Sequence, residues 1–316
     1  MRVLVINKYG GPEQLHIQEV PMPERKKKEV LVRVHCAGVN PVDYKVRNGM
    51  IRLLTGRKFP KILGGDIAGT VEQTDLNSDY RLGQRVFAML SLKGGGYAEY
   101  VSVKEKNLCL IPENIDFGQA AGYPLAALTA YQAIRKCGGI RPNFRVLVNG
   151  ASGGVGIFAV QLAKAMGASV TGVCSSNNVD FVKKLGASHV IDYTQQDFTK
   201  NSSKYHIIID AVAKSSFSKC KNILEKNGQY ITTLPSFEIF LTGLLNFSRS
   251  KKARLIAVKP NGKDLAVIAT YISKGLLRIN IQETFALENG ARAHQLLETE
   301  RVRGKLVLDC VRYLNQ

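Results

Sequence analysis

Four glycines lie within the eight residues 149–156, directly after the apolar run 145–149. Glycines permit a tight turn and a close approach of the backbone to a ligand, and N–H groups at the start of a following helix attract negative charge. The pattern therefore predicts binding of a dinucleotide pyrophosphate. A helix over about 155–166, ended by Gly167, and a strand over 169–173 would complete the βαβ unit that such a site needs. The alternative is an ordinary glycine-rich turn.

The residues that line this site follow from the position of the turn and of the next strand, which ends at Asp210. Ligands of open α/β sheets bind at the carboxyl ends of the strands. We expect the dinucleotide to contact Ser152, Gly153, Gly154, Val155 and Gly156 at its pyrophosphate, and the backbone of Ala211 and Val212 further along.

The adenosine end of the predicted site lacks the usual carboxylate. NAD sites place Asp or Glu about 20 residues past the glycines, whereas residues 174–178 read Cys-Ser-Ser-Asn-Asn. A 2′-phosphate would meet no repulsion there, which favours NADPH over NADH. The side chains able to hold it are Ser175, Ser176, Lys183, Lys184 and Tyr193. A polar surface loop and a solvated helix face would account for the same residues.

Composition indicates a globular enzyme. The 316 residues suit two domains, with 45% hydrophobic and 22% charged residues. The start of the chain is too short and too soon polar for a signal peptide, and no apolar run reaches the length of a membrane span, so we expect a cytoplasmic protein. The six cysteines lie far apart without a C-x-x-C pair, which argues for reduced thiols.

The formal net charge is +19, from 44 Lys and Arg against 25 Asp and Glu, with basic runs at 24–28 and 249–254. Such a charge attracts anionic partners, among them NADPH, RNA or an acidic membrane surface, without identifying one. Short basic runs are more often solvated loops than nucleic-acid sites. The apolar stretch 237–247 is predicted to cover a cleft or a subunit contact; peripheral membrane contact is its alternative.

The pattern of elements predicts an α/β fold with two parts. Alternating apolar residues and glycine-rich turns indicate strands at 29–36, 68–73, 85–89 and 97–103. A helix over 119–135 then leads into alternating strands and helices, with strands at 189–192, 205–210, 229–232 and 254–258, which is typical of a doubly wound parallel sheet. The tail has a strand, a helix at about 289–300 and a strand at 305–309. We expect domains at 1–119 and 120–274, with 275–316 returning to the first.

Several motifs together resemble the medium-chain dehydrogenase/reductase superfamily over nearly the whole chain. They are Ala37-Gly-Val-Asn-Pro-Val-Asp-Tyr-Lys45, Gly65-Asp-Ile-Ala-Gly69, Gly95-Gly-Tyr-Ala-Glu99, Leu125-Ala-Ala-Leu-Thr-Ala130, Leu185-Gly-Ala187 and Gly304-Lys-Leu-Val307, in addition to the glycine turn. The zinc-independent quinone oxidoreductase branch is the most similar, and Gly49-Met-Ile-Arg52 with Arg57-Lys-Phe-Pro60 is similar to its chloroplast-envelope members. Position 151 is Ala, whereas the broader glycine pattern begins with Gly. Alanine at this position is similar to what that branch has.

The resemblance implies a GroES-like β domain, a Rossmann domain, NADPH, a homodimer, and reduction of quinones or of the C=C bond of α,β-unsaturated ketones and aldehydes. Zinc is not expected. Asn40 stands where zinc-dependent relatives have a cysteine ligand, and Gly64-Gly-Asp66 stands where they have Gly-His-Glu, so too few ligands remain for a metal. The five histidines are scattered singly and are expected to be structural or exposed.

Matching motif positions nominates Asn40, Tyr44 and Lys45 in the substrate cleft, where they would stabilise the oxygen that becomes negative during hydride transfer. Thr129 is expected near the nicotinamide, and Lys305 is expected to reach the cofactor. Each has a structural alternative: Asn40 precedes Pro41 in a turn, Tyr44 packs, and Lys305 begins a strand.

Three functions compete on this sequence. A reductase of quinones or enones ranks first, and an enoyl-thioester reductase on the same scaffold ranks second. A nucleic-acid-binding or membrane-associated protein that keeps the nucleotide fold ranks third, because a fold does not determine a function.

Overall fold

The computed structural model describes residues 1–234, 238–239 and 250–311, which form two compact units. Unit 1 comprises Met1–Leu128, Lys259–Gly275 and Ile279–Gln316, and unit 2 comprises Thr129–Val258 and Leu276–Arg278. Residues 259–274, expected in the second domain, belong to unit 1 because the helix that they form packs against a unit 1 strand at Leu108.

Unit 2 is built on a six-stranded parallel sheet with the strand order β11-β10-β9-β12-β13-β14. This is the doubly wound order in which the chain starts at the centre and proceeds first to one edge and then to the other. The strands are β9 (Arg145–Asn149), β10 (Ser169–Cys174), β11 (His189–Asp192), β12 (Tyr205–Asp210), β13 (Leu224–Thr232) and β14 (Lys252–Leu255). The expected fold class is confirmed.

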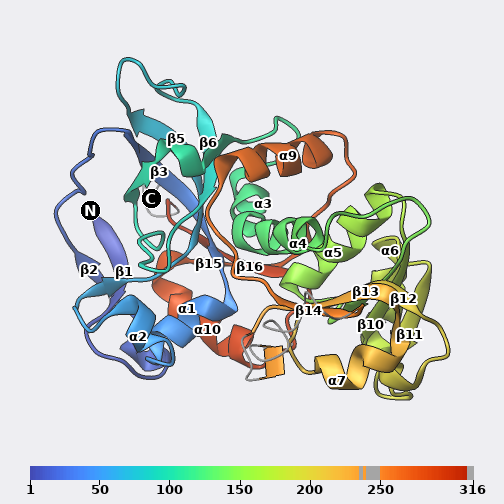
Figure 1. Cartoon of the computed structure of the whole chain (residues 1–316). Coiled ribbons are helices and arrows are strands. Elements are labelled where there is room, and N and C mark those ends of the chain that lie inside the picture. Colours follow the sequence, from blue (N-terminus) through green and yellow to red (C-terminus); the bar gives the residue numbers. More distant parts are fainter. Residues whose placement is uncertain (235–237, 240–249, 312–316) are drawn as a thin grey trace. The chain divides into compact units, whose positions relative to one another are not determined.

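Helices cover the two faces of this sheet, and Figure 1 shows α5 and α6 on one face and α7 on the other. They are α5 (Gly154–Ala165), α6 (Val179–Lys184) and α7 (Phe217–Cys220). Val146, Leu147 and Val148 of β9 are fully buried, as a central parallel strand covered on both faces requires. The apolar run before the glycines is therefore the centre of the unit 2 core.

Unit 1 contains an antiparallel-rich sheet that joins the two ends of the chain. Its order is β15-β16-β3-β5-β6-β8, with β7 also pairing β3. The strands are β3 (Glu29–Val39), β5 (Asp66–Gln73), β6 (Arg85–Met89), β7 (Tyr100–Lys104), β8 (Leu108–Leu110), β15 (Ile281–Ala286) and β16 (Lys305–Asp309). A second, three-stranded sheet has the order β2-β1-β4, with β1 (Arg2–Ile6), β2 (His16–Glu19) and β4 (Lys61–Ile62). The expected return of the C-terminal strand to the first domain is seen in the pairing of Leu306 with Val39.

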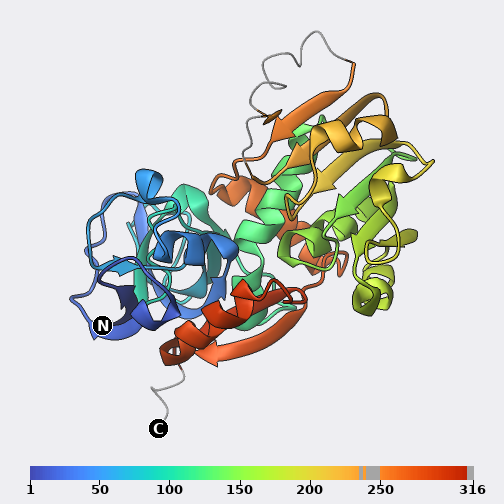
Figure 2. The same cartoon turned by 90° about the horizontal axis from the view of Figure 1, so that it is seen from below.

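The helices of unit 1 are α1 (Pro41–Arg47), α2 (Arg52–Thr55), α3 (Phe117–Gly122), α9 (Gly262–Ser273) and α10 (Gly290–Glu298), while α4 (Pro124–Lys136) runs from unit 1 into unit 2. Two of them, α3 and α10, pack on interior strands of its larger sheet. Figure 2 shows α10, in red, lying along the strand β15. The Asn261 side chain caps α9 by accepting hydrogen bonds from the N–H groups of Lys263 and Asp264, at 2.9 and 3.1 Å.

Three expectations for single elements were wrong. The helix expected over 119–135 is divided into α3 and α4, because Pro124 lacks the N–H that a continuous helix needs and instead begins α4. The strand expected over 97–103 starts only at Tyr100, since Tyr97 accepts a hydrogen bond from Leu4 of β1. The strand expected over 254–258 is β14, which ends at Leu255, and α9 was not anticipated.

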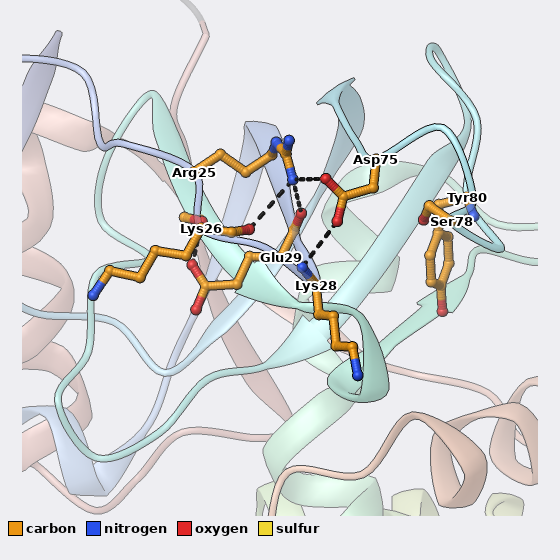
Figure 3. A network of polar contacts seen from close by, with 8 residues as sticks. Arg25, Lys26, Lys28, Glu29, Asp75, Ser78 and Tyr80 are labelled. Atoms are coloured by element: carbon orange, nitrogen blue, oxygen red, sulfur yellow. Dashed lines mark hydrogen bonds and ion pairs between the residues drawn. The ribbon is translucent and has the colours of Figure 1, made fainter.

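The basic run 24–28 is partly tied into a turn of unit 1. The Arg25 guanidinium donates to Asp75 Oδ1 at 2.6 Å, and the Lys28 backbone N–H donates to Asp75 Oδ2 at 2.9 Å. These bonds hold the pKa of Asp75 below its usual range. Figure 3 shows the ammonium ends of Lys26 and Lys28 pointing away from this network. Part of the basic run is thus structural, and part faces solvent.

Among the described residues, no helix has the length and apolar content needed to cross a bilayer. The apolar stretch 237–247 lies outside the described residues except for Glu238 and Ile239, as does Arg249 of the second basic run.

Candidate functional site

The glycine turn connects β9 to α5 at the carboxyl edge of the unit 2 sheet. Gly153 is the N-cap of α5 and offers no side chain to the first N–H groups of this 12-residue helix. Gly150 has φ +79°, which favours glycine. A Cβ on Gly156 would lie 2.0 Å from the Gly150 carbonyl oxygen, so the helix and the turn approach each other as only glycine allows. The N-terminal end of α5 is therefore open to an anion.

The next strand brings a second predicted segment to this turn. The Ala211 N–H donates to the Asn149 carbonyl at 3.0 Å, and a Cβ on Gly150 would meet Val212 Cγ1 at 2.4 Å. Buried Asp210 holds the edge together, because its Oδ1 accepts from the Asn149 amide at 2.9 Å and its Oδ2 accepts from the Tyr230 hydroxyl at 2.7 Å. The glycine turn and the segment Ala211–Val212 are thus neighbours, as expected of a dinucleotide site.

The predicted adenosine end contains a carboxylate that was not anticipated. Asp192 ends β11 opposite Cys174 of β10, and its Oδ2 accepts a hydrogen bond from Ser176 Oγ at 2.6 Å. Hydrogen bonds from Ser176 and Thr194 lower the pKa of Asp192, so it is ionised at neutral pH. The expectation that no carboxylate borders this end was wrong, because it considered the end of β10 alone and the parallel register places the end of β11 beside it.

Ser175 and Tyr193, also predicted at this end, lie in the same place, whereas Lys183 and Lys184 lie in the last turn of α6. Ser175 follows β10, and the Tyr193 backbone N–H donates to the Cys174 carbonyl at 3.0 Å. The Tyr193 side chain is 59% exposed, which leaves it accessible to a ligand. Thr129, by contrast, is buried in α4.

In unit 1, Asn40 and Lys305 form one buried cluster with Asp66. Lys305 Nζ donates to the Asn40 side-chain oxygen and, at 3.2 Å, to the Val39 carbonyl. The Asn40 amide nitrogen donates to Asp66 Oδ2 at 2.9 Å, and Asp66 Oδ1 accepts from the Leu125 N–H at 2.9 Å. Both ends of the Asn40 amide are thus engaged within the protein, and Lys305 is only 3% exposed.

Burial sets the protonation of this cluster. It raises the pKa of Asp66 to about 7, although the Lys305 ammonium and the Asn40 amide oppose the rise. Burial also lowers the pKa of Lys305, while the two nearby carboxylates favour its charged form. Because a buried ammonium holds the place beside Asn40 and Asp66, a divalent cation would be repelled there.

A chain of hydrogen bonds leads from α1 to the C-terminal helix α10. Arg47 Nη1 lies 3.1 Å from His294 Nδ1, and because arginine can only donate, Nδ1 must accept and Nε2 must carry the proton. Nε2 then donates to the Tyr97 hydroxyl at 3.3 Å, and that hydroxyl donates to Asp43 Oδ2 at 3.0 Å. Arg47 also pairs with Glu298 at 2.5 Å.

The charge state of this chain follows from its burial. Burial lowers the pKa of His294 to about 3, so its ring is neutral, and raises the pKa of Asp43 to about 6 against the opposing Asn40 N–H. The Asn40 N–H donates to Asp43 Oδ2 at 2.8 Å, so Asp43 takes part in a capping box at the start of α1. His294 is structural, as expected of a lone histidine.

A small pocket opens in unit 1 beside α1. Its walls are largely aliphatic and glycine residues, with the Asp43 carboxyl and Lys93 as the charged members: Val42, Asp43, Val46, Leu63, Gly64, Gly65, Met89, Leu90, Ser91, Leu92, Lys93, Gly94 and Leu125. Tyr44 and Lys45 are partly exposed on the same helix. Such walls suit a compact, mostly apolar acceptor.

A zinc ion does not fit the residues at the expected position. Within the part of the chain that the structure describes, no group of three His, Cys, Asp or Glu side chains could hold a metal. Position 65 is glycine, and the Asn40 and Asp66 side chains bind each other and Lys305.

Known proteins resemble this chain over nearly its full length. Two family models match: an alcohol dehydrogenase GroES-like domain at residues 26–113, and a zinc-binding dehydrogenase at residues 185–308. The chain is 34% identical to the chloroplastic quinone-oxidoreductase QR1 of Triphysaria versicolor, over 98% of each protein. It is 33% identical to the chloroplastic NADPH-dependent alkenal/one oxidoreductase of Arabidopsis thaliana, over 98% of this chain and 79% of that protein.

A solved structure shows the same fold. The quinone oxidoreductase from Coxiella burnetii superposes with a TM-score of 0.89 and 31% identity, over 98% of this chain and 99% of that one. The chain belongs to the quinone oxidoreductase branch of the medium-chain dehydrogenase/reductase superfamily, with a GroES-like unit 1 and a Rossmann-like unit 2. It is an NAD(P)H-dependent oxidoreductase of the quinone or alkenal/one reductase type.

Proposed function

We propose that the chain uses NADPH to reduce quinones or the C=C bond of α,β-unsaturated ketones and aldehydes, without a metal. The observation that carries the cofactor proposal is the glycine turn, which presents the open N-terminus of α5 at the carboxyl edge of the sheet beside Ala211. We assign the pyrophosphate to residues 152–156 and the nicotinamide to Ala211, Val212 and Thr129.

The preference for NADPH over NADH is supported by Ser175 and exposed Tyr193, whose hydroxyls can donate to a 2′-phosphate, whereas the Ser176 hydroxyl already donates to Asp192. The relative from Arabidopsis is named as NADPH-dependent. Asp192 opposes the preference, because its carboxylate is ionised beside Ser176. The preference for NADPH over NADH therefore depends on whether these hydroxyl donors outweigh the negative charge of Asp192.

NADPH supplies a hydride from its nicotinamide, so the protein must position the acceptor and stabilise the oxygen that becomes negative. We assign the acceptor to the apolar pocket of unit 1. We assign the stabilising donors to Tyr44 and Lys45, which do not line that pocket but lie on α1 between its lining residues Asp43 and Val46. Asn40 was nominated as a third donor, but its amide is engaged by Lys305 and Asp66. We therefore assign Asn40 and Lys305 to positioning of the loop before α1.

The test is oxidation of NADPH and NADH by the purified chain with a panel of quinones, 2-alkenals, longer enones and enoyl thioesters. We expect turnover with quinones or enones, faster with NADPH, and unchanged by a chelator. Turnover confined to enoyl thioesters would overturn the acceptor class, and loss of activity that zinc restores would overturn the metal-free chemistry. Absence of binding to either nucleotide by calorimetry would overturn the enzyme proposal itself.

A further inference from the structure

Unit 1 carries three large apolar side chains in solvent that the proposed reaction does not use. Met50, Leu53 and Leu54 have 66%, 93% and 72% of their surface exposed. They lie on and beside α2, at the edge of unit 1 in Figure 1. Single exposed apolar residues need no explanation, whereas three within five positions indicate a contact surface.

The charged residues within the stretch of sequence that carries these side chains are all basic. Arg52, Arg57 and Lys58 are exposed. Between Asp43 and Asp66 the sequence has six basic residues and no acidic one. We call residues 50–58 the basic apolar projection. The basic and the apolar side chains belong to the same nine residues. A partner that covers this surface must therefore bind cations and bury aliphatic groups at the same place.

The base of the projection is fixed by contacts of its own. The rings of Tyr9 and Phe59 pack edge to face with centroids 4.9 Å apart, and the Tyr9 hydroxyl donates to the Gly56 carbonyl. Lys61 Nζ donates to the Thr55 carbonyl at 3.0 Å and lies 5.1 Å from the centroid of the Phe59 ring. These contacts hold the backbone on the C-terminal side of Leu53 and Leu54, whose side chains extend into solvent.

We propose that the basic apolar projection docks unit 1 on an anionic lipid bilayer. Guanidinium and ammonium groups bind headgroup phosphates, and aliphatic side chains beside them enter the boundary between the headgroups and the acyl chains. A single bilayer surface then binds the basic side chains and buries the apolar ones. The docking is independent of the proposed reaction, since it needs neither NADPH nor an acceptor.

Other partners would not match both the charges and the apolar side chains of the projection. A second copy in a two-fold interface would bring the same cations together, in a chain whose formal net charge is already +19. A nucleic acid would bind the cations but would leave Met50, Leu53 and Leu54 in water, because single strands are bound by stacking on aromatic rings.

The test is flotation of the whole chain with phosphatidylcholine vesicles, with and without phosphatidylglycerol. We expect binding to the anionic vesicles only, weakened by salt. The variant Arg52→Gln/Arg57→Gln/Lys58→Gln should bind about a hundredfold more weakly, since each basic side chain near an anionic surface contributes about fivefold. The control Lys26→Gln/Lys27→Gln/Lys106→Gln removes three exposed charges elsewhere in unit 1 and should bind like the wild type.

A second variant separates the apolar contribution. Leu53→Ser/Leu54→Ser should weaken flotation about tenfold, whereas Leu76→Ser, at a leucine that is 100% exposed elsewhere in unit 1, should not. Melting temperatures should match the wild type in every variant, because the altered side chains lie in solvent.

Four results would overturn the proposal. They are absence of flotation by the wild type; equal losses in a variant and its control; a concentration-dependent dimer that only Leu53→Ser/Leu54→Ser abolishes; and a raised KM for apolar acceptors in that variant with unchanged flotation. The last would assign the projection to acceptor entry. A chain that floats but does not oxidise NADPH would leave the docking intact and defeat the proposed function.

Discussion

Alanine at two glycines of the same turn should separate cofactor binding from folding. Gly153 has φ −83° and ψ 174°, which alanine adopts readily, and a Cβ there would lie 3.5 Å from the Gly150 carbonyl oxygen, an ordinary contact. At Gly156 the Cβ would lie 2.0 Å from the same oxygen and 2.8 Å from Ala151 Cα, so the backbone must move. The two methyl groups therefore have different effects.

Gly153→Ala should leave the melting temperature nearly unchanged, because the backbone is compatible and a gain of at most about 1 kcal/mol from the stiffer chain offsets a poorer helix cap. Its methyl group enters the space that we assign to the pyrophosphate. A displacement costing about 1–3 kcal/mol would raise the Kd for NADPH about 5–150-fold. Gly156→Ala should also cost the fold about 1–3 kcal/mol and lower the melting temperature by about 3–10 °C.

The assay is calorimetric titration of both variants with NADPH, beside thermal unfolding without the nucleotide. If Gly153→Ala bound NADPH as tightly as the wild type and unfolded at the same temperature, the pyrophosphate would not lie at this turn. If Gly156→Ala unfolded like the wild type, the close approach of α5 to Gly150 would be refuted.

Three further outcomes are expected. Lys305→Met should lower the free energy of unfolding by about 3–5 kcal/mol, because Asp66 loses its buried partner; a weaker affinity for NADPH with unchanged stability would instead restore Lys305 to the cofactor site. Asp192→Asn should raise the ratio of kcat/KM for NADPH over NADH about fivefold, because the substitution removes a negative charge beside the proposed 2′-phosphate; an unchanged ratio would place the 2′-phosphate elsewhere. His294 has a pKa of about 3 in the fold against 6.5 when unfolded, so its contribution is complete above pH 6.5 and is lost as the pH falls toward 3. Between pH 7 and 5 the stability of His294→Gln relative to the wild type should therefore rise by about 2 kcal/mol in urea denaturation, and a constant difference would contradict the buried neutral ring.

The parts of the fold that the sequence predicted depend on local signals. The apolar run of β9, the glycines and the helix α5 lie within about twenty residues, and their burial follows from their own pattern. The sequence over 119–135 also has a local helical signal. Pro124 interrupts it, because a residue without an N–H cannot continue α3 and instead begins α4.

The parts of the site that could not be predicted depend on register. Asp192 reaches Ser176 only because β11 lies beside β10 with Asp192 opposite Cys174. Lys305 contacts Asn40 because β16 pairs antiparallel with β3, a partner 265 residues away in sequence. A single sequence carries no pattern that joins such distant residues, so the role of Lys305 was assigned to the cofactor instead of to Asn40.

The pairing of β16 with β3 has a consequence for how the protein is made. Residues 36–39 of β3 gain their β16 partners only when residues 306–309 leave the ribosome, so the first unit to be synthesised is the last to close. Until then the edge of β3 stays open, and the Asp43 and Asp66 carboxylates lack the Lys305 ammonium. Chains cut short before residue 306 are therefore expected to be captured by chaperones or to aggregate, even though the whole Rossmann-like unit has already been translated.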